Sequence, residues 1–419
     1  MSAQPTPIAA SAAAFATRIE FMVALAASLH RYGTTAQRLE GAIEAVARRL
    51  GLDCEPWSNP TGLILSFSDP QRPPGVSHAT RVIRLPPGET NLYKLCEADR
   101  IAEEVLAGRL DIVEGHAALR ALERDAGWRA HLQQVAGFCL AAASLAGLLR
   151  LPWLDIATAA VIGALVGLLA VAGRGRPQMK EADEAIAGIV AGGLTGLVAT
   201  FVAPLNLNTV VITSMIVLMP GMALTNAFSE LTSQHLISGT ARLFGALATL
   251  LKLTVGTMIA LTALHLAGLE PQVRAWRPQP AWVEWCAMVT AAWAFSALFR
   301  TGRRDILLVM AAAIAGYQIS RLGGQWLGSP VGVFLSALVV TVAGNGYAQW
   351  MNRPGALIRV PGIIMLVPGS TSLRTVLVAV QQQDVAAGQQ AAIAVLNVLL
   401  ALIAGLLMGN LLLPARRSL

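Results

Sequence analysis

Residues 207–230 read LNTVVITSMIVLMPGMALTNAFSE, and residues 358–380 read IRVPGIIMLVPGSTSLRTVLVAV. Each stretch is long and apolar enough to cross the roughly 30 Å hydrocarbon core of a bilayer as a helix. Each also carries a Pro-Gly pair within apolar surroundings, Pro220-Gly221 in the first and Pro368-Gly369 in the second. Because proline removes a backbone donor and interrupts a helix, the two stretches predict membrane spans that are broken at matching places.

The rest of the chain supports a membrane protein. Its 419 residues are 55% hydrophobic and only 13% charged, which is too little charge to cover a soluble protein of this length. Apolar blocks of membrane-spanning length follow one another after residue 131. The sequence therefore predicts a mainly α membrane protein with ten transmembrane helices: Leu132 to Leu149, Leu154 to Gly173, Ala185 to Val202, Leu207 to Phe228, Leu243 to Leu266, Val283 to Phe299, Ile306 to Leu322, Trp326 to Ala343, Ile358 to Val380 and Ala391 to Leu413.

A smaller, charge-rich region precedes these blocks. We expect residues 1–14 to be disordered and residues 15–130 to form a small cytoplasmic α+β domain. Helical spacing of apolar residues, N-cap candidates and stop signals predict four helices, and a change to strand-like runs predicts two strands. The helices are Phe15 to His30, Ala36 to Leu50, Leu92 to Ala107 and Asp111 to Glu123, and the strands are Gly62 to Phe67 and Thr80 to Leu85.

The membrane region divides into two halves of five helices, residues 131–268 and 283–414, with an external linker over residues 269–282. The halves resemble one another at an offset of 148 residues, which places Pro220 opposite Pro368. Because each half has an odd number of helices, the second half is expected to be inverted relative to the first. Inverted repeats with helices interrupted at matching positions point to the substrate site of a secondary transporter.

The cationic residues predict the orientation in the membrane. No cleavable signal peptide is recognisable at the N-terminus, so we expect a multi-pass protein of the inner or plasma membrane with both termini in the cytoplasm. This orientation places Arg174, Arg176, Lys180, Arg242, Arg300, Arg303, Arg304, Arg353, Arg359, Arg416 and Arg417 inside, and only Arg150, Arg274, Arg277 and Arg321 outside. The net charge of +7 is thus explained by the positive-inside rule, and a nucleic-acid partner is not expected.

Polar residues that follow the two Pro-Gly pairs are the candidate substrate ligands. Small hydroxyls and an amide can replace the water around a polar solute, and arginine can pair with a carboxylate. The alternatives are a plain proline kink, and snorkelling of the arginine to the membrane surface. The predicted substrate site consists of Pro220, Gly221, Thr225, Asn226, Pro368, Gly369, Ser370, Thr371 and Arg374.

Lys252 lies midway along an apolar block, where a charge is costly and usually marks a pathway or an ion pair. Glu230 is a candidate partner, and the two could form a coupling pair or a proton relay. The alternative for Glu230 is a solvated residue at a helix end. Asp155, Asp183, Glu184 and Asp305 begin helices and are expected to act as caps.

The sequence contains few features that are typical of an enzyme. The six histidines have no metal-ligand spacing, the four cysteines form no CxxC pair and no Walker A sequence occurs, so we expect no enzyme, no metal and no cofactor. A membrane-anchored hydrolase would need a nucleophile and a base. Ser66, Ser68, Asp69 and His78 lie close in sequence but match no known triad pattern.

Several short motifs resemble the threonine/serine exporter family. They are Leu29 to Thr35 (LHRYGTT), Leu39-Glu40, Leu50-Gly51, Thr80 to Leu85 (TRVIRL), Asn91 to Leu95 (NLYKL), the helix running to Leu122, Met219-Pro220-Gly221 and Val367-Pro368-Gly369. The resemblance extends from about Phe15 to Leu413. It implies secondary export of threonine and serine, driven by the proton gradient or the membrane potential.

Some members of this family divide the two halves between separate chains and are associated with export of dicarboxylates such as succinate. The resemblance therefore leaves a dicarboxylate exporter as the alternative. The expected partners are a small-molecule substrate and the lipid bilayer. Association into a homo-oligomer is an additional possibility that the sequence leaves open. The first domain could instead be a regulatory module that senses substrate.

Overall fold

The computed structural model describes residues 14–72, 78–123, 127–274, 278–366, 373 and 385–414. The expected disorder of residues 1–14 falls almost wholly outside this part of the chain. So do Pro368, Gly369, Ser370, Thr371 and Arg374 of the predicted substrate site.

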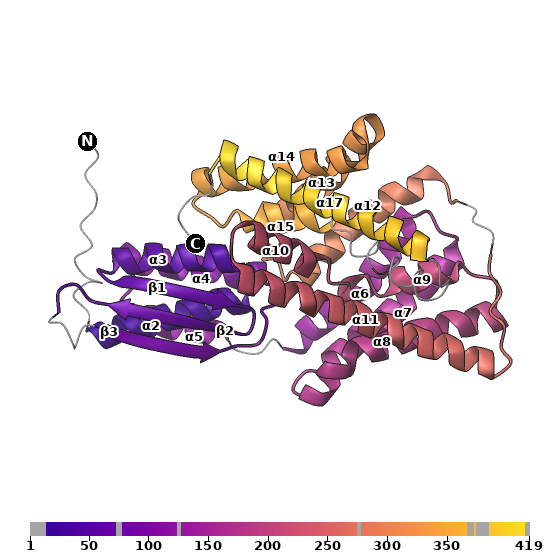
Figure 1. The fold of residues 1–419 in the computed structure, drawn as a ribbon, viewed down its shortest axis with the longest axis horizontal. Helices are drawn as coiled ribbons and strands as arrows, with labels where there is room; N and C mark the ends of the chain where they lie inside the picture. Colours follow the sequence, from indigo (N-terminus) through magenta and orange to yellow (C-terminus); the bar gives the residue numbers. More distant parts are fainter. Residues whose placement is uncertain are drawn as a thin grey trace.

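The first part of the chain forms an α+β unit at one end of the molecule's long axis (Figure 1). We call it the N-terminal unit (residues 15–122). Three antiparallel strands form one sheet in the order β1-β2-β3, in which Asp53 pairs with Ser68 and Gly62 with Arg84. Its elements are α2 (Phe15–Arg31), α3 (Ala36–Arg49), β1 (Asp53–Asn59), β2 (Gly62–Ser68), β3 (His78–Arg84), α4 (Leu92–Leu106) and α5 (Ile112–Leu122).

The core of the N-terminal unit lies between the sheet and its helices. Alternate residues of the central strand, Leu63, Leu65 and Phe67, are buried, as expected for a strand with one covered face. They share one cluster with apolar residues of α2 and α3. The four predicted helices and two predicted strands are all present, and β1 is an additional strand.

The first membrane half contains α6 (Trp128–Leu148), α7 (Trp153–Ala172), α8 (Pro177–Phe201), α9 (Leu207–Ser214), the short 3-10 helix η1 (Ile216–Leu218), α10 (Gly221–Thr232) and α11 (Leu236–Leu266). Helices α8 and α11 pack closely because glycines on both helices allow it. A Cβ on Gly188 would lie 2.5 Å from the carbonyl oxygen of Leu253, and one on Gly256 would lie 2.0 Å from that of Ala185.

The second membrane half contains α12 (Ala281–Leu298), α13 (Ile306–Leu327), α14 (Ser329–Met351), α15 (Ala356–Ile364) and α17 (Val385–Leu412). Helix α14 packs along α17 as α8 packs along α11. Within the described residues, eight helices are long and apolar enough to span a membrane, or nine if the bent α9–α10 segment is one span. The protein is thus a multi-pass membrane protein, while ten spans and inverted repeats stay predictions.

The span expected between Leu207 and Phe228 is interrupted. Helix α9 ends at Ser214, the 3-10 turn follows, and α10 begins at Gly221 with Pro220 as its N-cap. The two parts are bent by 59°. Proline at this point cannot donate to the preceding turn, and the chain changes direction there.

Candidate functional site

A small pocket with both polar and apolar lining residues lies where the N-terminal unit meets both membrane halves. It has a volume of about 120 Å³. Its walls come from the loop after α2, the start of α3, α10, α15 and the end of α17, which lie close together in Figure 1. The lining residues that can hydrogen-bond through side chains are Tyr32, Thr34, Thr35, Gln37, Arg38, Thr90, Thr225, Asn226, Ser229, Arg359 and Asn410.

Gly33 determines the conformation of the loop after α2, which lines the pocket. Gly33 has φ of +87°, a conformation that favours glycine, and it ends helix α2. A Cβ at this position would lie 3.0 Å from the Cα of Thr90. The close approach of these two loops brings Thr34 and Thr90 to the same wall.

Helix α10 provides the membrane side of the pocket. Met222, Thr225, Asn226 and Ser229 line it at helical spacing, so a single face of α10 is presented. Thr225 is only 2% exposed, and its Oγ1 has no hydrogen-bond partner among the residues that the structure describes. A buried hydroxyl is normally hydrogen-bonded, so this one makes Thr225 a candidate ligand-binding residue.

The second membrane half contributes Arg359 from α15 and Asn410 from α17. Asn345 of α14 donates from Nδ2 to Oδ1 of Asn410 at 2.9 Å, which fixes the Asn410 amide. The carbonyl side of that amide is thereby occupied, and its NH₂ group can donate to a bound oxygen.

The pocket is cationic. Arg38 and Arg359 line it, no aspartate or glutamate does, and neither arginine has an ion pair among the described residues. Burial lowers the pKa of Arg38 to about 10, and the side chain therefore stays charged at neutral pH. Such a site attracts a carboxylate or another small anion.

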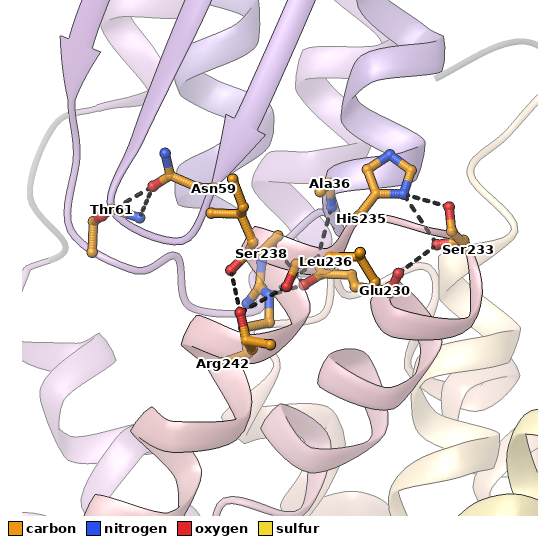
Figure 2. A network of polar contacts seen from close by, with 11 residues as sticks. Ala36, Asn59, Thr61, Glu230, Ser233, His235, Leu236, Ser238 and Arg242 are labelled. Carbon is orange, nitrogen blue, oxygen red and sulfur yellow. Dashed lines mark hydrogen bonds and ion pairs between the residues drawn. The ribbon is translucent and has the colours of Figure 1, made fainter.

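A polar network beside the pocket holds α3 against α10 and α11 (Figure 2). Glu230 is 1% exposed; its carboxylate accepts hydrogen bonds from the backbone N–H of Ala36 at 3.0 Å, from Ser238 at 2.7 Å and from Arg242 at 2.9 Å. Nearby, Nε2 of His235 lies 3.0 Å from a carboxylate oxygen of Glu40.

A second contact joins the N-terminal unit to the other half. The backbone N–H groups of Leu92 and Tyr93 donate to the carbonyls of Phe299 and Arg300 at 2.9 and 3.3 Å. Two free donors of the first turn of α4 thus meet two carbonyls at the end of α12. The N-terminal unit is therefore attached to both membrane halves.

Only part of the substrate site that was predicted from the sequence lines this pocket. Thr225 and Asn226 line the pocket, whereas Pro220 and Gly221 do not and instead begin the helix that carries them. Pro368, Gly369, Ser370, Thr371 and Arg374 lie outside the described residues. Arg38, Arg359, Thr34, Ser229 and Asn410 were not predicted as ligands, although Thr34 belongs to the LHRYGTT motif and Arg359 is a cation inside an apolar block.

The expected pairing of Lys252 with Glu230 is wrong. Nζ of Lys252 donates to the carbonyl oxygen of Glu181 at 2.8 Å and lies 3.4 Å from Glu184. Glu230 pairs with Arg242 and is buried rather than solvated. The reason is that α8 and α11 extend beyond their apolar blocks, which places Glu184 and Arg242 on helices.

Three of the expected caps, Asp155, Glu184 and Asp305, have other partners, and Asp183 and Glu184 do not begin a helix because α8 starts at Pro177. Oδ2 of Asp155, at the start of α7, accepts from the side-chain amide of Asn206 at 2.5 Å and thereby ties α7 to the start of α9. Asp305 pairs with Arg353 at 2.5 Å and makes no capping hydrogen bond. Within the described residues, no group of three or more His, Cys, Asp or Glu side chains could hold a metal ion.

Comparison with known proteins identifies the family. Residues 20–264 match the family described as "Putative threonine/serine exporter", and residues 284–412 match "Threonine/Serine exporter, ThrE". The chain is 23% identical over 305 residues to the "Probable threonine/serine exporter" of Mycobacterium tuberculosis, covering 68% of this chain and 56% of the relative.

The chain is also 21% identical over 368 residues to "Pheromone-regulated membrane protein 10" of Zygosaccharomyces rouxii, covering 85% of this chain and 37% of the relative. It thus spans little more than half of the first relative and less than half of the second. No solved structure matches. The matches of both membrane halves and the N-terminal unit show that the chain belongs to the threonine/serine exporter family.

Proposed function

We propose that this protein is a secondary exporter of threonine and serine, driven by the proton gradient or the membrane potential. The family membership supports a transporter rather than an enzyme. The excess of Lys and Arg in the breaks on one side supports a plasma or inner membrane location with both termini in the cytoplasm. In this orientation the pocket faces the cytoplasm, from which an exporter takes its substrate.

The observation that carries this proposal is the buried hydroxyl of Thr225, which has no partner among the described residues and belongs to a pocket shared by the two membrane halves. A transporter that alternates between two open states needs its substrate to contact both halves, because their relative movement exposes the site to one side and then the other. Helix α10 comes from the first half, and α15 and α17 come from the second.

The Pro-Gly break supports the same site. Because α10 starts at Gly221, the backbone N–H groups of its first turn have no partners within the helix, and the positive end of the helix dipole lies there. We propose that a substrate released from the pocket passes this break, and that residues 368–374 form its counterpart in the second half. Pro220, Gly221, Pro368, Gly369, Ser370, Thr371 and Arg374 would then line the path beyond the pocket.

Transport by the purified protein in liposomes tests the proposal. Vesicles preloaded with labelled threonine should release or accumulate it against its gradient when a proton gradient or membrane potential is imposed, and a protonophore with valinomycin should abolish net uphill movement. Serine should compete and a bulky amino acid such as tryptophan should not. Uphill movement that persists on ATP alone, or vesicles no different from protein-free ones for every substrate tried, would contradict the proposal.

A dicarboxylate exporter is the second candidate, and the charge of the pocket favours it. Two arginines suit a solute with two carboxylates, whereas among the described lining residues only neutral oxygens can accept hydrogen bonds from the ammonium group of an amino acid. Competition between labelled threonine and unlabelled succinate in the same vesicles separates the two candidates. Stronger inhibition by succinate than by serine would select the dicarboxylate.

A further inference from the structure

Arg38 belongs to the N-terminal unit but lines the pocket together with residues of the membrane helices. It is the third residue of α3, whose preceding loop, Tyr32 to Thr35, forms part of the same wall. Its side chain is half-buried and has no hydrogen bond or ion pair among the described residues. A partly buried guanidinium without a partner is unusual, because a desolvated charge is normally paired.

The other arginines of α3 have ordinary surroundings. Arg48 is exposed and donates to the carbonyl oxygen of Glu44 in its own helix, and Arg49 lies 3.5 Å from Glu103 on the surface. Arg38 differs from both in facing a pocket. Burial lowers the pKa of Arg38, but the guanidinium remains charged at neutral pH.

The position of Arg38 is fixed by the buried carboxylate of Glu230. That carboxylate accepts the backbone N–H of Ala36, two residues before Arg38, and is itself held by Ser238 and Arg242 (Figure 2). Glu230 lies one turn beyond Asn226 and next to Ser229 on α10. The same helix that supplies pocket residues therefore sets where α3 begins.

We infer that Arg38 binds the carboxylate of the transported solute, so that the N-terminal unit completes the substrate site instead of serving only as a regulatory attachment. The inference rests on the proposed function and applies to an amino acid or a dicarboxylate alike. Thr225, which lines the same pocket, would form a hydrogen bond with the solute's remaining polar group. Glu230 acts as the positioning residue, since it holds the first turn of α3 in place.

Substitution of Arg38 combined with an altered substrate tests the inference. Wild type, Arg38→Gln, Arg38→Lys and the matched control Arg48→Gln are reconstituted, and the half-saturating threonine concentration is measured from the side of the N-terminal unit. Inhibition by threoninol, in which an alcohol replaces the carboxylate, is measured in parallel. We expect Arg38→Gln to raise the half-saturating threonine concentration at least about tenfold, which corresponds to one lost charge-assisted pair.

The same substitution should change inhibition by threoninol less than twofold, since threoninol has no carboxylate for Arg38 to bind. Arg38→Lys should fall between wild type and Arg38→Gln because lysine keeps the charge but loses the bidentate geometry. Arg48→Gln should match wild type throughout. Melting temperatures of the detergent-solubilised variants show whether each is folded, and Arg38→Gln should melt no lower than wild type because it removes an unpaired, desolvated charge.

Three results would count against these expectations. If threonine and threoninol are weakened equally in Arg38→Gln, the residue has a structural role and the inference is overturned. If Arg38→Gln behaves like Arg48→Gln while wild type transports threonine, the inference alone is overturned. If wild type neither transports nor is thermally stabilised by threonine, serine or succinate, the proposed function and the inference are both overturned.

Discussion

Glu230 of helix α10 accepts a hydrogen bond from the backbone N–H of Ala36, at 3.0 Å, across 194 positions of the chain. This bond joins the first residue of helix α3 in the N-terminal unit to the membrane helix that carries Thr225 and Asn226. Because Leu92 and Tyr93 also donate to the end of α12, the N-terminal unit connects the two membrane halves. A movement of one half relative to the other must therefore deform or release one of these contacts.

Removal of one member of the Glu230–Arg242 pair should be strongly destabilising. Glu230→Ala leaves Arg242 with a charge that is largely buried, and a broken buried pair costs about 3 to 5 kcal/mol. The double variant Glu230→Ala/Arg242→Ala should recover part of the loss, with a coupling free energy of about 1 to 3 kcal/mol. Denaturant titration of the detergent-solubilised protein measures these free energies of unfolding.

The surface pair of Arg100 with Glu104 provides the control for this cycle. Arg100 is exposed, and an exposed pair contributes about 0 to 1 kcal/mol, so Arg100→Ala should change little. Strict additivity of the Glu230 and Arg242 substitutions would show that the two side chains do not interact as described.

Thr225→Val should separate binding from stability. Valine has the shape of threonine but lacks the hydroxyl, and the Thr225 hydroxyl has no partner within the described protein. Loss of an unsatisfied buried hydroxyl should leave the melting temperature unchanged or raised, because its desolvation cost disappears. The half-saturating substrate concentration should rise about tenfold, equivalent to about 1.4 kcal/mol.

Thr254→Val on helix α11 is the matched control, since its hydroxyl donates to the carbonyl of Leu250 rather than facing the pocket. It should transport like wild type. An unchanged half-saturating concentration in Thr225→Val would remove Thr225 from the substrate site.

Acid should destabilise the N-terminal unit through His30. Burial lowers the pKa of His30 below its ordinary value, while Nε2 donates to the carbonyl of Pro86 at 3.1 Å. The unfolded chain therefore binds this proton more tightly, so the stabilisation is present above about pH 6.5, the ordinary histidine pKa, and is lost as the pH falls through the lowered value. The melting temperature should fall between pH 7.5 and pH 5, and fall less in His30→Gln.

Burial raises the pKa of Glu40, which favours the folded state at lower pH and so opposes the effect of His30. The difference between wild type and His30→Gln is therefore the decisive quantity. Identical curves for the two would contradict a buried neutral histidine.

Local patterns predicted the helices of this protein well. The helix expected from Leu92 to Ala107 spans Leu92–Leu106, and the helix expected from Phe15 to His30 spans Phe15–Arg31. Such segments carry their own signals of apolar period, caps and stops. Strand β1 (Asp53–Asn59) was missed because it is an edge strand with a central proline and charged residues, which conceal the alternation.

The pocket could be predicted only in part because it depends on docking between distant segments. Thr225 and Asn226 were predicted, since they follow a Pro-Gly pair within a single apolar block. Arg38 and Arg359 reach the same pocket from elements about 320 residues apart in sequence, and neither shows its partner locally. The wrong pairing of Lys252 has a similar cause, because the extension of α8 that places Glu184 beside it lies outside the apolar pattern.

Protection of a cysteine placed at Ser229 tests the central claim, that the shared pocket holds the substrate. Ser229 lines the pocket beside Thr225 and Asn226. The four native cysteines, of which Cys286 is exposed and Cys54 and Cys96 have pKa values raised to about 12 by burial, are first replaced by alanine. In the Ser229→Cys variant, the rate of labelling by a small charged thiol reagent is measured with and without substrate. Millimolar threonine or succinate should slow labelling at least about threefold while glycerol has no effect; labelling at the same rate with every solute would contradict a substrate site in this pocket.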